Sequence, residues 1–383
     1  MSRKILLIGG TGILSTDVCR RALMEGYEVY TLNRGKRKYN VEMQSKQIIC
    51  DVREDNIDAI RQKLDGLYFD AVIDFLSMKE DHVRKAFQII EDRCNQYVFI
   101  STATVYKKFE ENEIITENTP IGNDKWEYAA NKVRCEQLVR NQYREFCKHY
   151  TIIRPYVTYN HMRIPFAIIP PNNWTFINRV MLGKPVLLWN HGEAVCTITN
   201  TKDFAVGVVG LLTNTKAYED SFHITSDFRM TWKEVLDETL DAIGMKVEIA
   251  DKSIDEIIRY LPEYAGVLNG DKGTNMMFDN EKIKKAVPTF NCEISYHEGI
   301  QETIRYFKGH KEVQIVDYRW EGRMDWYMSR FCFRGNREMR KKLTLGCYRR
   351  ISLKDKYHYL INRYRFLGIL AHIVGKYPTS RTT

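Results

Sequence analysis

Three residues between positions 102 and 132 have types and spacings that suit proton transfer. Tyr128 and Lys132 are four positions apart, so on a helix they would share one face, one turn from each other. An ammonium group there would lower the pKa of the phenol from its usual value of about 10 toward neutral pH. The hydroxyl of Thr102, 26 positions before Tyr128, could hold the oxygen of the reacting substrate. Such a set suits proton exchange with an alcohol or a ketone.

A glycine-rich turn near the N-terminus offers a place for the hydride carrier that such a reaction needs. Gly9 and Gly12 fit the first two positions of G-x-x-G-x-x-G, between an expected strand and an expected helix. The backbone there turns tightly and lets a pyrophosphate approach the helix N-terminus. The third position is Ser15, which could loosen helix packing, cap the helix or touch the phosphate. The cofactor contacts expected from this motif are Gly9, Thr11, Gly12, Ile13 and Leu14.

The end of the second expected strand bears on the choice of cofactor. An acidic residue at this place binds the ribose hydroxyls of NAD, but this chain has Asn33 followed by Arg34. A guanidinium suits a 2′-phosphate, so the sequence favours NADP over NAD. Asp51, after the third expected strand, could accept a hydrogen bond from the adenine amino group or cap the next helix.

The elements that must position these residues alternate between strand and helix. This rhythm is typical of βαβ units and predicts a Rossmann-type doubly wound parallel sheet. Strands are expected at 4–8, 27–32, 46–50, 69–74, 96–100 and 149–153, and helices at 15–25, 57–64, 79–92 and 125–148. After Arg154-Pro155, shorter mixed elements indicate a smaller substrate lobe interleaved with the last strand or two of the sheet. The predicted division is 1–155, 156–311 and a C-terminal extension at 312–383.

Together these motifs resemble the extended short-chain dehydrogenase/reductase family, in its epimerase/dehydratase branch. The resemblance covers about residues 4–308 and rests on the order and spacing of GGTGIL, STATVY, YAANK, Arg154-Pro155 and Asp279-Asn-Glu-Lys282. It implies that Tyr128 is the acid/base, that Lys132 binds the nicotinamide ribose and lowers the tyrosine pKa, and that Thr102 binds the reacting oxygen. The Asn-Arg-Gly turn also resembles an atypical subgroup that includes chloroplast RNA-binding relatives.

Departures from the family pattern narrow the implied reaction. The family's 4,6-dehydratases carry Asp-Glu after the equivalent of Thr102, where this chain has Ala103 and Thr104. The resemblance therefore implies an epimerase or a ketoreductase acting on a sugar, with Thr104 as a candidate substrate contact. The arginine with which the family's nucleotide-sugar enzymes grip a diphosphate is missing before Asp203. Arg163 and Arg179 are the candidates to replace it, although a surface charge is an equally good interpretation of Arg179.

The composition bounds the remaining expectations. The chain has 383 residues, 44% of them hydrophobic, and no apolar run long enough to span a membrane. Nine scattered cysteines without C-x-x-C pairs indicate reduced thiols in a cytoplasmic protein and no metal site. The net charge of +9 is concentrated at the C-terminus, since residues 301–383 hold 19 Lys+Arg against 7 Asp+Glu. The catalytic body is therefore close to neutral, and its charge does not indicate nucleic-acid binding.

The extension at 312–383 is rich in aromatic and basic residues, and three interpretations of its role are open. We expect a helical appendage that packs on the body or on a second subunit, which leaves a homodimer open. A basic amphipathic helix at an anionic membrane surface is second, and nucleic-acid binding is third. The expected protein is thus an NAD(P)-dependent sugar oxidoreductase or epimerase. The alternative is a dinucleotide-binding scaffold or RNA-binding relative with little redox activity.

Overall fold

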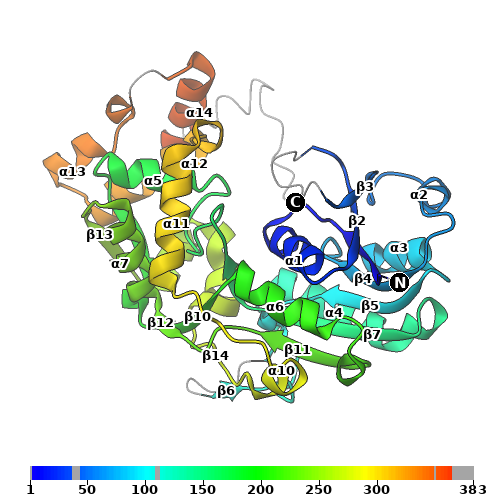
Figure 1. The fold of residues 1–383 in the computed structure, drawn as a ribbon. Coiled ribbons are helices and arrows are strands. Elements are labelled where there is room, and N and C mark those ends of the chain that lie inside the picture. The colour runs from blue at the N-terminus through cyan, green and yellow to red at the C-terminus, as the bar shows by residue number, and fades with distance from the viewer. Residues whose placement is uncertain (1, 37–43, 108–112, 349–350, 365–383) are drawn as a thin grey trace. The chain divides into compact units, whose positions relative to one another are not determined.

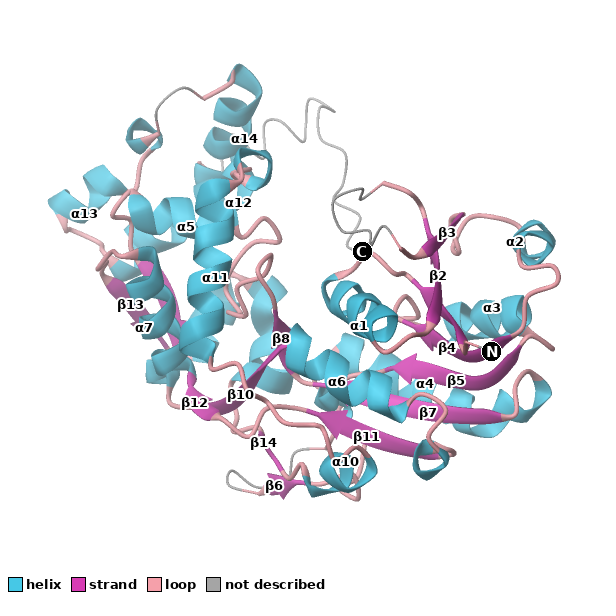
Figure 2. Cartoon of the chain, viewed as in Figure 1, coloured by secondary structure: helices cyan, strands magenta, loops and turns pink. Residues whose placement is uncertain are grey.

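The computed structural model describes residues 2–36, 44–107, 113–348 and 351–364, and the fold is built around a seven-stranded parallel sheet (Figures 1 and 2). The strands lie in the order β11-β7-β5-β4-β1-β2-β3. They are β1 Lys4–Ile8, β2 Glu28–Asn33, β3 Lys46–Ile49, β4 Phe69–Asp74, β5 Cys94–Ile100, β7 His149–Pro155 and β11 Asp220–Ile224. The predicted doubly wound parallel sheet is confirmed, and β11 is the late strand that was expected to return to it.

Helices cover both faces of this sheet because each strand alternates its side chains between two cores. Ile5 and Leu7 of β1 belong to a core with residues of α1 (Ile13–Met24) and α6 (Thr201–Leu211). Leu6 and Ile8 belong to the other core. That core is covered by α2 Ile57–Lys63, α3 Glu80–Ile90 and α4 Glu127–Gln142. The strand ends that carry the glycine turn and Thr102 are therefore held by packing on both faces.

Shorter elements complete this first compact unit, which comprises residues 1–165, 193–232 and 265–299. One small sheet joins β8 Val157–Tyr159, β10 Val195–Asn200 and β12 Arg229–Thr231, and another pairs β6 Ile114–Ile115 with β14 Met277–Phe278. The helical segments are α9 Ala265–Val267, a π-helical turn at Leu268–Lys272 and α10 Glu281–Ala286.

A second compact unit comprises residues 166–192, 233–264 and 300–383 and is mostly helical. It contains α5 Trp174–Met181, α8 Ile254–Tyr260, α12 Tyr318–Tyr327, a π-helical turn at Met328–Cys332, α13 Arg337–Lys342 and α14 Leu353–Arg363. Its strands are β9 Val186–Trp189 and β13 Ile249–Lys252, and α7 Trp232–Ile243 and α11 Tyr296–Gly309 lead into it. No helix in the described part of the chain is long and apolar enough to cross a bilayer.

The two units correct the predicted division at 155 and 311. After residue 165 the chain returns to the first unit twice, at 193–232 and 265–299, because β10 and β11 in the first stretch and β14 in the second pair with strands there. The extension expected at 312–383 is not a separate part either. Its described residues belong to the second unit, as the interpretation of a helical appendage requires.

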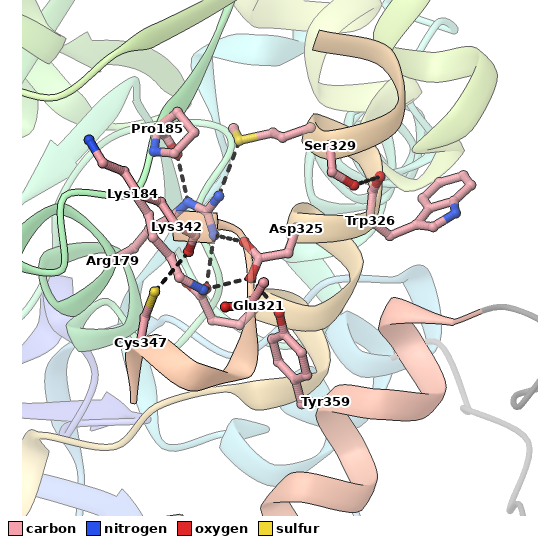
Figure 3. Close-up of polar contacts among 12 residues, drawn as sticks. Arg179, Lys184, Pro185, Glu321, Asp325, Trp326, Ser329, Lys342, Cys347 and Tyr359 are labelled. Atoms are coloured by element: carbon pink, nitrogen blue, oxygen red, sulfur yellow. Dashed lines mark hydrogen bonds and ion pairs between the residues drawn. The ribbon is translucent and has the colours of Figure 1, made fainter. Parts of the chain in front are cut away.

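A buried ion cluster attaches the extension to this second unit (Figure 3). Arg179 Nη1 of α5 lies 2.8 Å from Glu321 Oε2 and 2.9 Å from Asp325 Oδ1 of α12. Lys184 Nζ lies 2.6 Å from Asp325 Oδ2, and all four side chains are fully buried. Tyr359 of α14 donates a hydrogen bond to Asp325 over 2.5 Å, so α12 joins α5 to α14.

Candidate active site

The turn between β1 and α1 contains a glycine, Gly9, that no other residue could replace without strain. Gly9 has φ +92°, and a Cβ there would lie 2.6 Å from Cγ of Leu76. Gly12 is the N-cap of α1. Ser15, at the third motif position, is fully buried, donates to the Gly9 carbonyl over 2.6 Å and accepts from the Gly12 amide over 2.8 Å. Of the three roles left open for Ser15, the structure shows capping of the turn.

This turn forms one wall of a cavity of about 400 Å³ in the first unit. The described residues that line it are Gly9, Thr11, Gly12, Ile13, Leu14, Ser15, Asn33, Arg34, Lys36, Cys50, Asp51, Val52, Arg53, Phe75, Leu76 and Arg163. Every cofactor contact predicted from the sequence is among them except Lys132. The cavity brings together five stretches that are far apart in the chain: those at the ends of β1, β2, β3 and β4, and Arg163.

The part of the cavity formed by the residues after β2 and β3 is basic. Arg34, Lys36 and Arg53 are all exposed. Among the described lining residues Asp51 is the one with a carboxylate, and its Oδ2 lies 3.8 Å from Arg34 Nη1. Asn33 is buried, and its side chain accepts from the Gly35 amide over 2.8 Å, so its role is to shape the turn that presents Arg34. Arg53 was missed by sequence reasoning, although its place two residues after Asp51 could have pointed to it.

These residues fit a dinucleotide. The glycine turn leaves room for a pyrophosphate at the start of α1, where the first helical turn carries no acidic residue to repel it. The guanidinium of Arg34 and its basic neighbours suit a phosphate or ribose at the other end.

Thr102 and Tyr128 are brought together as predicted. Thr102 lies two residues after β5 and caps the short helical turn Ala103–Val105, and its hydroxyl lies close enough to the Tyr128 side chain to lower the pKa of the phenol. Thr104 Oγ1 lies 3.1 Å from Thr102 Oγ1 and is buried. Three hydroxyl groups therefore form a chain from Thr104 through Thr102 to the phenol, which lies at the first turn of α4.

The environment of Tyr128 differs from the expected one, because its pKa is raised and not lowered. Burial is the largest cause, while the Thr102 hydrogen bond and the charge of Arg163 act in the lowering direction. Lys132 is not among these influences. The phenol is therefore protonated at neutral pH in this state of the protein.

Lys132 is buried one turn further along α4. Its Nζ donates to the backbone carbonyls of Ser77 and Ile100, each over 2.7 Å, and burial lowers its pKa to about 8. An ammonium has three donors, so one N–H is left for another acceptor. The predicted contact of Lys132 with the nicotinamide ribose stays a prediction.

The α4 helix is locked to the sheet beside this site by a buried carboxylate. Glu136, one turn after Lys132, accepts from Ser101 over 2.6 Å and from Arg154 over 2.6 and 2.9 Å. Arg154 and Ser101 are thus structural partners that hold the end of β5 against α4. This explains why both stand in the motifs that carried the resemblance.

Arg163 and Arg179, the two candidates for a diphosphate contact, have different environments. Arg163 is exposed, lines the cavity and acts electrostatically on Tyr128. Its loop is tied to the glycine turn, since Asn160 Nδ2 donates to the Ile13 carbonyl over 3.3 Å. Arg179 is wrong as a substrate contact and is no surface charge, because its guanidinium is fully buried and is engaged by Glu321 and Asp325.

Sequence reasoning also missed a π-helical turn at Leu268–Lys272 next to the hydroxyl chain. Asn123 Nδ2 donates to the Thr104 carbonyl over 2.8 Å and to the Gly270 carbonyl over 2.7 Å, which joins the two. The carboxylate of Asp271 raises the pKa of Tyr128. Such turns occur often at functional sites, and no local pattern in this segment announces its position.

Comparison with known proteins agrees with this architecture. A model described as "NAD dependent epimerase/dehydratase family" matches residues 5–224. The "Chloroplast stem-loop binding protein of 41 kDa b, chloroplastic" of Arabidopsis thaliana is 25% identical over 242 residues, which are 60% of this chain and 60% of that protein. The match thus spans less than two thirds of that relative's own length.

Solved structures share the fold at low sequence identity. An epimerase from Methanothermobacter thermautotrophicus superposes with a TM-score of 0.67 at 13% identity, over 82% of this chain and 94% of its own. A UDP-glucuronic acid 4-epimerase from Bacillus cereus, solved with UDP-glucuronic acid and NAD, superposes with a TM-score of 0.63 at 16% identity. The superposition covers 80% of this chain and 99% of that chain.

Proposed function

Because the chain belongs to the NAD dependent epimerase/dehydratase family, we propose that it oxidises or reduces a carbon of a sugar with NAD(P). The observation that carries this proposal is the position of the Thr102 hydroxyl beside the Tyr128 phenol, whose pKa it lowers, one helical turn from the buried Lys132. A nucleotide-linked sugar is the proposed substrate, since structures of this fold include an epimerase with bound UDP-glucuronic acid.

The side chains of the site perform the proton transfer in this proposal. When bound, a nicotinamide dinucleotide supplies hydride exchange at the substrate carbon. Tyr128 donates its proton to the carbonyl oxygen, or takes it back from the hydroxyl in the opposite direction. Thr102 holds the same oxygen, and Thr104 orients Thr102 through the hydroxyl chain.

The charges around Tyr128 bear on the direction of the reaction. Burial keeps the phenol protonated at neutral pH, which suits donation to a ketone. Oxidation of an alcohol instead needs the tyrosinate, which the positive charge of Arg163 would stabilise. Ketone reduction is therefore the first proposal and epimerisation the second, and Ala103 and Thr104 lack the carboxylates for a 4,6-dehydratase.

NADP is proposed over NAD as the cofactor. The cavity lining contains Arg34, Lys36 and Arg53, and Asn33 stands where an acidic residue would select the ribose hydroxyls of NAD. The NAD bound to the epimerase from Bacillus cereus is a property of that protein, so a direct affinity measurement must separate the two cofactors.

Mass spectrometry of the small molecules released from the natively purified chain tests this function. Retained NAD(P) together with a nucleotide sugar supports it, and the ratio of NADP to NAD tests the cofactor proposal. Consumption of NADPH with keto-sugar nucleotides separates reduction from epimerisation, which consumes no net cofactor. Failure to bind either dinucleotide at millimolar concentration would contradict the proposal.

The second candidate is an RNA-binding relative with little redox activity. It is favoured by the match to a chloroplast stem-loop binding protein. A gel-shift assay with stem-loop RNA at increasing salt separates the two candidates. Tight RNA binding by a chain that turns over no sugar would favour the second.

A further inference from the structure

The second unit contains a surface cavity of about 920 Å³ for which the oxidoreductase function has no use. This volume is in the range of small-molecule sites. The described residues that line it are Tyr260, Trp326, Ser329, Arg330, Phe331, Arg334, Gly335, Arg340, Arg363 and Tyr364. All of them lie beyond residues 5–224, where the family model matches.

The cavity is strongly basic. Four arginines line it, and none of its described lining residues is acidic. Arg330, Arg334 and Arg340 are exposed and form no ion pair with any described residue. The nearby Arg323, outside the lining, is paired with Glu263 over 2.8 Å. Three guanidinium groups therefore keep their planar forks for an external anion, and phosphate is the anion that this geometry matches.

Aromatic rings form the wall between these arginines. Phe331 stacks on Tyr260 with the ring centroids 3.8 Å apart and an angle of 19°, and Trp326 meets Phe331 edge-on at 5.5 Å. Tyr364 is 45% exposed, with the Arg363 guanidinium 5.6 Å from its ring centroid. Aromatic faces beside arginines are the combination that holds a nucleobase and its phosphate together.

The cavity wall is rigid because the buried ion cluster fixes the helix beneath it. Asp325 of α12 points toward Arg179, whereas the next residue, Trp326, points away from the cluster (Figure 3). The π-helical turn Met328–Cys332 follows directly and carries Ser329, Arg330 and Phe331 into the lining. A π-helical turn on a fixed helix is a frequent feature of binding sites.

We propose that this cavity binds a nucleoside phosphate, either as a free nucleotide or as a residue of single-stranded nucleic acid. The base stacks on the exposed ring of Tyr364 beside Arg363, and the phosphate lies between Arg330, Arg334 and Arg340. A membrane surface fits less well, because Trp326 is only 8% exposed and the rings face one another instead of protruding. This binding is independent of hydride transfer and of the cavity beside Gly9.

Fluorescence anisotropy of the full chain with a labelled ten-nucleotide oligo-A RNA tests the proposal. Saturating NADP is present throughout, so that binding in the cavity beside Gly9 does not contribute. The competitors are AMP, inorganic phosphate and vesicles of phosphatidylserine and phosphatidylcholine. We expect the RNA to bind and AMP to compete better than phosphate. If AMP binds as tightly as the RNA does per nucleotide, the ligand is a free nucleotide. If the RNA binds much more tightly than AMP, the ligand is single-stranded nucleic acid.

Matched variants locate the binding. Arg334→Gln with Arg340→Gln should weaken RNA binding about tenfold or more, because two charged hydrogen bonds are lost. Arg337→Gln is the control, since Arg337 is exposed on the same helix as Arg340 but outside the lining. Tyr364→Leu should weaken binding several-fold, while Tyr364→Phe keeps the ring and the affinity.

Four outcomes would overturn the proposal. The first is an equal loss of RNA affinity in Arg337→Gln and Arg340→Gln, which would indicate an effect of bulk charge, and the second is competition by phosphate as strong as that by AMP, which would indicate a simple anion site. The third is binding of vesicles in place of RNA, and the fourth is binding of neither RNA nor AMP at low salt. The circular dichroism spectrum of each variant must match that of the unmodified chain for the affinities to be comparable. We expect the substitutions to leave folding intact, because these positions are exposed.

Discussion

The Thr102 hydroxyl lies beside the Tyr128 phenol and lowers its pKa, although 26 positions separate the two residues in the chain. Thr102 stands at the carboxyl end of β5, and Tyr128 stands in the first turn of α4. The ends of a strand and of a helix that packs on it therefore meet at the proposed proton-transfer site. The spacing of the two residues is a consequence of this packing.

Tyr128→Phe removes the proposed acid and keeps the ring that fills the site. We expect turnover to fall about 10²- to 10⁴-fold, the range for loss of general acid–base catalysis, with dinucleotide affinity nearly unchanged. Turnover of UDP-sugars and NADPH consumption measure the first quantity, and titration of cofactor fluorescence measures the second. Tyr68→Phe, at an exposed position in the first unit, is the matched control. Normal turnover by the Tyr128→Phe variant would contradict the proposed role of Tyr128 as the acid.

Thr104→Val tests whether the chain of hydroxyls positions Thr102. Valine keeps the shape but removes the oxygen that lies 3.1 Å from Thr102 Oγ1. One hydrogen bond is lost, so we expect kcat to fall about two- to tenfold while KM changes little. Thr104→Ser, which restores the hydroxyl, should recover the rate. No recovery with serine would mean that Thr104 acts through packing.

Arg34→Gln tests the choice of cofactor. The arginine is exposed at the rim of the cavity, and loss of its charge removes an interaction with a 2′-phosphate that NAD lacks. We expect about tenfold weaker binding of NADP and little change for NAD. Arg61→Gln, on α2 and outside the cavity lining, controls for net charge. Equal weakening of both dinucleotides would contradict the NADP preference.

Lys132→Met gives a prediction for pH dependence. Burial depresses the pKa of Lys132 to about 8 from its ordinary value of 10.5, so between these values the unfolded chain binds the proton more readily than the folded one. Stability contributed by Lys132 therefore rises as pH increases through this window. Methionine also leaves the carbonyls of Ser77 and Ile100 without this donor, so the variant is less stable throughout.

The difference in Tm between the unmodified chain and Lys132→Met should accordingly be larger at pH 9.5 than at pH 7.5. Differential scanning fluorimetry at both values measures it. Lys79→Met, at the N-cap position of α3, serves as the control variant. A gap that narrows with rising pH would show that burial does not depress this pKa.

Glu321→Gln should destabilise the second unit strongly. The carboxylate is fully buried between Arg179 and Lys184, and its loss leaves two buried cations with a single acidic partner, Asp325. Breaking such a pair costs about 3–5 kcal/mol, measurable by urea denaturation. Lys252→Gln breaks an exposed pair with Glu256 in the same unit and should change stability little. Similar effects in both variants would show that the cluster does not anchor α12.

The strands, the helices and most of the cofactor site follow from local sequence. Short apolar runs predicted the strands of the sheet to within about two residues, because burial on both faces demands unbroken apolar side chains. The glycine turn and the end of β2 were identified from types and spacing alone, since backbone room and charge are properties of single residues. The Thr102–Tyr128–Lys132 set came from the family pattern of spacings.

Other features depend on which distant segments meet, and no local pattern contains them. Arg179 resembled a surface charge or a phosphate contact until α12 brought Glu321 and Asp325 to it from 142 and 146 positions away. The pKa of Tyr128 was expected to fall on account of Lys132, but burial raises it and Lys132 binds backbone carbonyls instead.

The sequence by itself determined the kind of fold, the place of the dinucleotide turn and the residues able to exchange a proton, because these rest on side-chain type and short-range spacing. Only the tertiary structure decided the protonation state of Tyr128, the structural role of Arg179 and the arginine-lined cavity around Phe331. Burial and long-range charge set these properties, and both arise only when the chain is folded.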